Sequence, residues 1–218
     1  MTSSNKNQQF TYDNSETLRQ IMNARRDVRG NRFLPTSIHQ DELDKIFDAA
    51  LSAPSVGFSQ PWEFITITDL NVRQSIAESF TIENDKASAM FDGQKSQQYQ
   101  HLKLEGILQS PLNIAVFYNP KKGPVLGQTS MPEMGRYSVV CAVQNMWLMA
   151  RSLNIGIGWV SILNPEHVKT ALNAPQDREL IAYLCVGYVD KFYDRPELET
   201  LEWETRKQAQ QVILNGSY

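Results

Sequence analysis

Three arginines with a carboxylate among them are the residues near the N-terminus that are best suited to chemistry. Arg25, Arg26 and Arg29 lie within five positions, and Asp27 stands between them. Guanidinium groups at this spacing can bind a phosphate through paired hydrogen bonds. We expect these cations to stabilise Asp27 as an anion, so that it either orders the arginines as a salt bridge or accepts a proton in a reaction. A solvated basic turn after a helix is the alternative that these residue types leave open.

A second polar stretch, residues 53–62 (APSVGFSQPW), connects an expected helix to an expected strand. Its hydroxyls Ser55 and Ser59, together with Gly57 and the amide of Gln60, are suited to holding a polar ligand through side-chain and backbone hydrogen bonds. Taken alone, the stretch is more typical of an ordinary polar turn.

Ser161 is a third candidate, at the end of a glycine-bearing segment, 155–162, that we interpret as a strand. Gly156 and Gly158 indicate the close approach of a ligand or of another backbone. They do not form a dinucleotide-binding fingerprint, because no third glycine opens a following helix. The Ser161 hydroxyl either bonds to backbone in the core or donates to a ligand.

Hydrophobic spacing predicts the elements that must position these residues. A helix with apolar residues from Leu43 to Leu51 ends at Pro54, and the alternating segment 63–68 follows as a strand. The other expected strands are 112–118, 155–162 and 181–189, of which the last is the most apolar and therefore central. The other expected helices include 72–80, 133–153 and one that begins at Asn164 and Pro165.

Two helix starts carry capping signals. Ser15 is the expected N-cap of the first helix, so that residues 1–14 form a loose tail. Ser37 and Gln40 form an expected capping box for the second helix.

Segment 133–153 is apolar on more than one side, which is typical of a helix shared between two subunits, so we expect a homodimer.

Residues 81–101 are polar around Met90 and Phe91 and predict a surface excursion or a lid over a site. Residues 190–218 lack periodicity and are interpreted as an arm. The whole chain, 1–218, then forms one α+β domain with layered helices and strands.

Composition excludes several classes of protein. The 218 residues include 21 basic and 24 acidic side chains, so a net charge of -3 gives no support for nucleic-acid binding. No apolar run is long enough to span a membrane and the N-terminus lacks a signal peptide, so a cytoplasmic protein is expected. Cys141 and Cys185 are expected to be buried, reduced thiols, and the three histidines show no metal-ligand spacing.

Five motifs carry a family resemblance when they are taken in order. They are 25–29 (RRDVR), 53–62 (APSVGFSQPW), 102–106 (LKLEG), 131–134 (MPEM) and 158–162 (GWVSI). From about Arg25 to about Arg206 the chain resembles the BluB branch of the nitroreductase-like flavoproteins, the 5,6-dimethylbenzimidazole synthases. The resemblance implies a central mixed sheet flanked by helices, with a C-terminal extended arm.

The resemblance also implies a site. FMN would be bound by the five residues from Arg25 to Arg29, including Val28, and by Ser55, Ser59, Leu104 and Ser161, with Arg206 as a further phosphate ligand. Asp27 and Ser161 would be catalytic, and a mobile lid would lie at 81–101. Within that lid we expect Met90 to touch the flavin, because it is the soft, adaptable side chain in a polar segment.

The implied chemistry consumes the flavin. Reduced FMN would be the substrate and O2 the co-substrate, with no metal, and the products would be 5,6-dimethylbenzimidazole and erythrose 4-phosphate. A homodimer would hold FMN at its interface, and a separate flavin reductase would supply the reduced form. Two rival functions remain: an NAD(P)H-dependent nitroreductase or flavin reductase, and an FMN-binding module without turnover.

Overall fold

A four-stranded sheet forms the centre of the computed structural model, which describes residues 8–217. Its strands, in spatial order, are β1 (Trp62–Ile67), β2 (Leu112–Tyr118), β4 (Glu179–Tyr188) and β3 (Ile155–Val160), and each pair of neighbours is antiparallel. The parallel component of the expected mixed sheet is limited to an isolated bridge between Asp27 and Ile157. The prediction that segment 181–189 is a central strand is confirmed, because β4 pairs on both sides.

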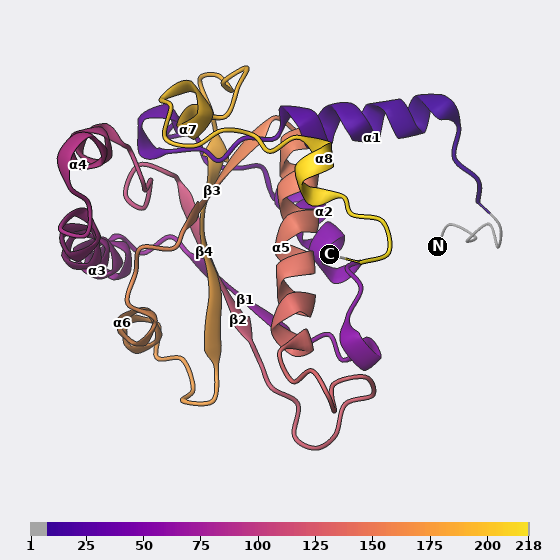
Figure 1. Cartoon of the computed structure of the whole chain (residues 1–218). Helices are drawn as coiled ribbons and strands as arrows, with labels where there is room; N and C mark the ends of the chain where they lie inside the picture. Colours follow the sequence, from indigo (N-terminus) through magenta and orange to yellow (C-terminus); the bar gives the residue numbers. More distant parts are fainter. Residues whose placement is uncertain (1–7, 218) are drawn as a thin grey trace.

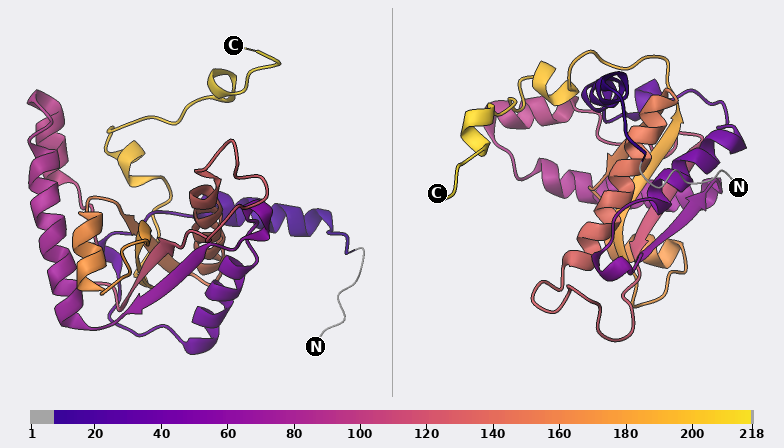
Figure 2. Two further views of the ribbon diagram at one scale, coloured as in Figure 1. Left: turned by 90° about the horizontal axis from the view of Figure 1, so that it is seen from below. Right: turned by 90° about the vertical axis from the view of Figure 1, so that its right-hand side faces the viewer.

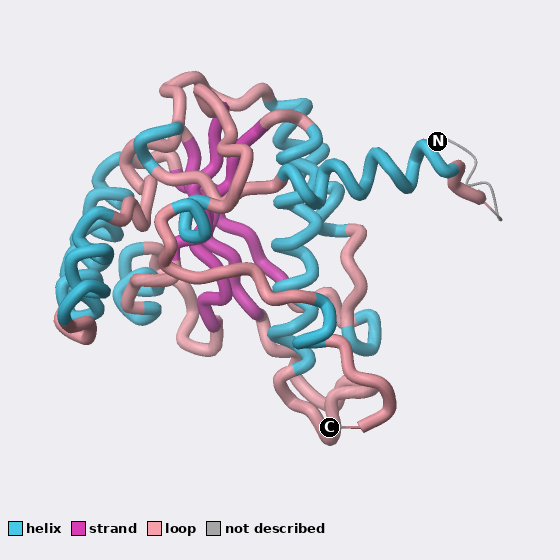
Figure 3. Tube along the Cα trace, turned by 45° about the horizontal axis from the view of Figure 1, so that its top comes forward, coloured by secondary structure: helices cyan, strands magenta, loops and turns pink. Residues whose placement is uncertain are grey.

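Helices cover both faces of this sheet (Figures 1 and 3). One face carries α2 (Gln40–Leu51) and α5 (Met134–Ser152), with α1 (Tyr12–Ala24) extending away from the body; the other carries α3 (Leu70–Ser88), α4 (Gly93–His101) and α6 (Pro165–Ala171). The short helices are η1 (Gly30–Arg32), η2 (Val56–Phe58), α7 (Glu197–Thr200) and α8 (Ala209–Val212). The α+β layering predicted from the sequence is confirmed.

Strand β2 shows why its sequence is a continuous apolar run. Ile114 and Val116 are fully buried in the core on the α2 and α5 side, whereas Ala115 and Phe117 belong to the core on the α3 and α6 side. Since successive side chains of a strand point to opposite faces, a sheet covered on both sides needs apolar residues at every position.

Helix α1 begins earlier than predicted. Thr11 is its N-cap, and its hydroxyl accepts a hydrogen bond from the Asn14 N–H at 3.3 Å while the Asn14 side chain accepts from the Thr11 N–H at 3.0 Å. The expected cap Ser15 lies inside the helix and bonds back to the Thr11 carbonyl. The expected loose tail is therefore helical from Tyr12 onward, and its residues 1–7 lie outside the described part of the chain.

The predicted capping box of α2 is wrong. His39 occupies the N-cap position without a side-chain hydrogen bond. The Gln40 amide donates instead to Asp44 Oδ1 at 2.7 Å, one turn further along the helix, so it does not reach back to Ser37.

Helix α5 confirms the expectation of apolar surface on more than one side. Its inner face is buried against the sheet and α2, whereas Tyr137 and Val140 on its outer face are 50% and 40% exposed. Cys141 shares this outer face and is exposed, so the prediction that it is buried is wrong for the single chain. Cys185 is buried as predicted, and burial raises the pKa of its thiol to about 12.

Residues 81–101 form a helical hairpin, which we call the hairpin: the second half of α3, an exposed turn at Met90, and α4 (Figure 2). The predicted helix at 72–80 thus continues to Ser88. Within residues 8–217, no helix combines the length and apolar character needed to cross a membrane.

Candidate functional site

The segment from Arg25 to Arg29 lies along the free edge of β3. The Val28 N–H donates to the Ile157 carbonyl at 3.0 Å, and the Trp159 N–H donates to Asp27 Oδ1 at 2.9 Å. A side chain at Gly158 would place its Cβ 2.0 Å from the Val28 carbonyl oxygen, so this close approach requires glycine there. The predicted close approach at Gly158 is confirmed. The group that approaches is the backbone of residues 25–29, which we call the arginine segment.

Asp27 forms an ion pair with Arg29, and the Arg29 guanidinium also donates to the Leu104 carbonyl at 3.0 Å. Burial raises the pKa of the Asp27 carboxyl above its ordinary value, although Arg29 and the Trp159 N–H act in the opposite direction. The expectation that the arginines hold Asp27 as a stabilised anion is therefore corrected, because removal of water from the carboxylate outweighs the attraction of the cations.

Arg25 and Arg26 are anchored on the last turns of α5. The Arg25 guanidinium lies 4.7 Å from the ring centre of Trp147, and the Trp147 indole N–H donates to the Arg26 carbonyl at 3.2 Å. Arg26 donates to the Asn23 and Asp194 carbonyls, but its Nε is buried without a partner among the described residues. Burial lowers the pKa of Arg26, with further contributions from neighbouring arginines.

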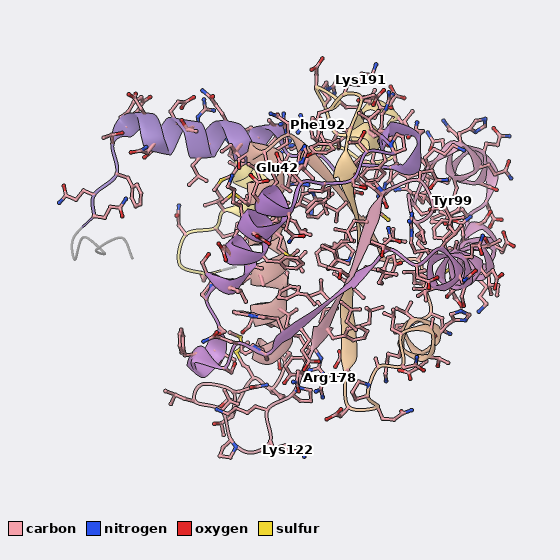
Figure 4. All side chains as sticks on the ribbon, turned by 180° about the vertical axis from the view of Figure 1, so that it is seen from behind. Glu42, Tyr99, Lys122, Arg178, Lys191 and Phe192 are labelled. Atoms are coloured by element: carbon pink, nitrogen blue, oxygen red, sulfur yellow. The ribbon has the colours of Figure 1, made fainter. Side chains whose placement is uncertain are left out.

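Arg151 of α5 binds the end of α1 and the start of the C-terminal arm. Arg151 donates to the Ala24 carbonyl at 2.9 Å, at the point where α1 ends. Its guanidinium also stacks 4.0 Å from the ring centre of Phe192, which Figure 4 labels beside the end of α5. The start of the C-terminal arm is therefore packed on the arginine segment.

A cavity of about 150 Å³ opens beside the arginine segment. Its lining consists of Arg25, Arg26, Asp27, Arg29, Leu102, Lys103, Leu104, Tyr193, Pro196, Glu197 and Leu198. Five residues predicted from the sequence therefore come together in this lining: Arg25, Arg26, Asp27, Arg29 and Leu104. Val28 does not line the cavity and is buried against β3. The cavity is smaller than the roughly 300–1,000 Å³ of typical small-molecule sites, so a larger ligand requires movement of a wall or an additional boundary.

The polar turn at 55–60 is strained and partly unsatisfied. Ser55 Oγ accepts from the Gln60 N–H at 3.1 Å, and Gln60 itself has a positive φ of 47°. Gly57 has a φ of 54°, and a Cβ there would lie 2.6 Å from the Leu126 carbonyl oxygen. Ser59 Oγ is buried with no hydrogen-bond partner in the described part of the chain, which leaves its hydroxyl unsatisfied.

A single chain does not bring this turn to the cavity. The Val56 N–H donates to Ser138 Oγ at 3.0 Å, near the start of α5, whereas Arg25 contacts Trp147, nine residues further along the same helix. At 1.5 Å per residue the two anchor points are about 13 Å apart along the helix axis. Ser55 and Ser59 thus lie at the opposite end of α5 from the arginine segment.

Ser161 follows β3 directly and is exposed. It lies two residues after Trp159, whose N–H binds Asp27 and whose carbonyl lies 3.5 Å from Arg29 Nη1. Ser161 is therefore close in sequence to the residue that holds Asp27, just past the end of β3.

Two further predicted residues lie outside the cavity lining. Arg206 is exposed in the arm, although its charge contributes to the lowered pKa of Arg26 and so acts on the arginine segment. Met90 is 81% exposed at the tip of the hairpin. Residues 102–104, which follow the hairpin directly and which we call the base of the hairpin, line the cavity, whereas Met90 does not.

Sequence reasoning missed the wall that the C-terminal arm contributes. Tyr193, Pro196, Glu197 and Leu198 line the cavity, and Glu197 adds a second carboxylate that raises the pKa of Asp27. The only local signal was Pro196 before a four-residue helix, which is too short to show periodicity.

The model of the nitroreductase family matches residues 22–188, and the chain belongs to this family. Among curated proteins it is 42% identical to a 5,6-dimethylbenzimidazole synthase of Rhodospirillum rubrum, over 84% of this chain and 87% of the relative. It is 35% identical to a 5,6-dimethylbenzimidazole synthase of Rhodobacter capsulatus, over 89% and 94%. A crystal structure of iodotyrosine deiodinase bound to FMN and 3-iodo-L-tyrosine is similar in fold, with a TM-score of 0.72, 21% identity and coverage of 92% and 99%.

Proposed function

We propose that this protein is a 5,6-dimethylbenzimidazole synthase, which uses O2 to break reduced FMN and releases 5,6-dimethylbenzimidazole, erythrose 4-phosphate and the remaining pyrimidine fragment of the ring. The single observation that carries the proposal is the Asp27 carboxyl, paired with Arg29 and set among arginines in a cavity at the edge of β3. The identity to two curated synthases along most of their length supports it.

The residues present fit FMN. Arg25, Arg26 and Arg29 offer positive charge and planar donors to a phosphate or to the carbonyl edge of a ring. The buried, unpartnered Arg26 Nε and Ser59 Oγ are two donors that a ligand can satisfy. Bound reduced FMN would supply the electrons that O2 takes up and the ring atoms that leave as product.

The chain's own residues would hold and protect this substrate. Asp27, fixed by the Trp159 N–H, is placed to accept a proton in its ionised form. Ser161, two residues after Trp159, would donate a hydrogen bond to the bound ring. Leu104, held by Arg29, gives the cavity an apolar wall that limits water.

A homodimer would complete the site. A two-fold axis across the middle of α5 sets the start of this helix in one protomer beside its end in the other. Ser55 and Ser59 of one protomer would then approach the arginine segment of its partner. Exposed apolar residues favour this arrangement: Tyr137 and Val140 on α5, and Leu18 and Met22, each 48% exposed, on α1.

Replacing both Tyr137 and Val140 by Asp is expected to give monomers, because unpaired charges would be buried in an otherwise apolar interface. FMN affinity should fall in the same variant, since half of the site would be lost. Light scattering and flavin fluorescence measure the two effects, with Leu70→Asp on α3, an equally exposed apolar residue, as the control. A monomeric wild type at micromolar concentration would refute the interface.

The hairpin is proposed to close over the flavin, with Met90 as its apolar contact. Met90→Glu is then expected to lower product yield, because a charge would be forced against the ring. Product yield and FMN dissociation constant should be measured together, with Ile82→Glu on the same hairpin as the control. Unchanged yield and affinity for Met90→Glu would contradict this role.

Aerobic incubation with reduced FMN tests the reaction itself. Mass spectrometry is expected to detect 5,6-dimethylbenzimidazole, and FMN recovered unchanged would instead favour a binding module without turnover. Rapid bleaching of bound flavin by NADPH would favour the nitroreductase function. A separate flavin reductase is proposed as the source of reduced FMN.

A further inference from the structure

The C-terminal arm, residues 190–217, crosses the hairpin at Trp203. The Trp203 ring meets Phe91 edge-on at 5.2 Å between ring centres, and Phe91 stacks on Tyr99 at 5.1 Å. The centre of the Trp203 ring also lies 6.2 Å from that of Tyr99. The Lys95 ammonium lies 4.3 Å from the centre of the Trp203 ring and donates to the Trp203 carbonyl at 2.5 Å. These four side chains form what we call the aromatic cluster.

The aromatic cluster is anchored on both of its sides. Tyr99 is buried, and its hydroxyl donates to Asn84 Oδ1 of α3 at 2.8 Å, which fixes it within the hairpin (Figure 4). On the other side, the Trp203 N–H donates to the Leu198 carbonyl of α7 at 2.9 Å. The cluster therefore joins two segments that are far apart in the sequence.

These two segments lead directly to the two walls of the cavity. Residues 102–104 follow α4, and the Leu102 N–H donates to the Tyr99 carbonyl at 3.0 Å. Pro196, Glu197 and Leu198 form the opposing wall at the start of α7. Because the cavity of about 150 Å³ lies below the roughly 300 Å³ of the smallest typical ligand sites, a flavin needs more space, and separation of these two walls would supply it.

We propose that Trp203 is a positioning residue that holds the two cavity walls together and must leave Phe91 and Tyr99 before FMN can enter or leave. This inference rests on the proposed function, because it assumes FMN in the cavity. Arg206, three residues further on, is carried by the same arm.

The test is the rate at which FMN leaves the protein, followed by the recovery of flavin fluorescence. Trp203→Ala is expected to release FMN about tenfold faster than the wild type, since two aromatic contacts and one cation–π contact are lost. Trp203→Phe retains an aromatic ring and should release FMN at close to the wild-type rate. Hydrogen exchange in residues 91–101 should accelerate in Trp203→Ala only.

A second readout concerns the reaction with O2. An open cavity should let more of the reduced FMN be reoxidised to FMN, with O2 leaving as hydrogen peroxide, so peroxide per O2 consumed should rise in Trp203→Ala. Lys95→Ala should show a weaker form of both effects, and Lys86→Ala, which removes a lysine of the same hairpin outside the aromatic cluster, should show neither.

An FMN release rate in Trp203→Ala equal to that of the wild type would overturn the proposal. Equal losses in Trp203→Phe and Trp203→Ala, accompanied by a lowered Tm, would also overturn it in favour of a structural role. If the wild type forms no 5,6-dimethylbenzimidazole, the proposed function fails, while the release rates still decide the role of Trp203.

Discussion

Asp27→Asn is expected to bind FMN and to lose at least about 100-fold in the rate of product formation, the lower end of the range for general acid–base groups. The amide can still accept the Trp159 N–H bond that fixes this side chain against β3. It cannot take up a proton. FMN dissociation constants measured beside the yield of 5,6-dimethylbenzimidazole separate this role from a purely structural one.

If Asp27 only orders the arginines, affinity and activity should fall together, because Arg29 would lose its ion-pair partner. Asp190→Asn is the matched control, since Asp190 pairs with Arg32 outside the cavity lining. Full product yield from Asp27→Asn would remove Asp27 from the catalytic residues and leave the fold unaffected.

The raised pKa of Asp27 also sets a pH dependence. Product formation should increase with pH through this raised pKa, because only the ionised carboxylate accepts a proton. Stability changes in the opposite sense: a carboxyl with a pKa that is higher in the folded than in the unfolded protein stabilises the fold below the unfolded pKa, and this contribution disappears as pH rises through the folded pKa. Asp27→Asn should abolish both dependences.

Ser161→Ala is expected to bind FMN and to react about 100- to 1,000-fold more slowly, the cost typical of removing one donor from a developing charge. The effect should fall on the rate and not on affinity, because the arginine segment and the turn at 55–60 remain intact. Single-turnover measurement of product with saturating reduced FMN checks this expectation.

Ser55→Ala provides the contrasting control for Ser161. Ser55 Oγ accepts the Gln60 N–H and so shapes the turn, and its loss should weaken FMN binding more than the chemical step. A Ser161→Ala variant that behaves like Ser55→Ala would reassign Ser161 to binding.

The sequence determined the elements because their signals are local. The alternating segment at 63–68 and the apolar run at 112–118 predicted β1 and β2 to within one residue, since both depend on which side chains must be buried. Asn164 with Pro165 fixed the start of α6 through capping chemistry confined to neighbouring residues. The motif at 25–29 likewise identified the arginines that line the cavity.

The capping residues of α1 and α2 were not predicted correctly from the sequence, since several polar residues compete for the N-cap position at each helix start. Thr11 precedes Ser15 by one turn and takes its place, and Gln40 finds Asp44 in preference to Ser37. Such competition is decided by where the chain enters the helix, which the residue types alone do not specify.

Only the tertiary structure decided the direction in which the pKa of Asp27 shifts and the separation of the two halves of the site. The charge of Arg29 is visible in the sequence, but the removal of water that raises the pKa of Asp27 depends on packing against β3, α7 and the base of the hairpin. The distance between the turn at Ser59 and the arginine segment depends on the length of α5 that lies between their anchors. Burial and distance arise from contacts between residues far apart in the chain, and the local spacing of residue types along the sequence does not predict them.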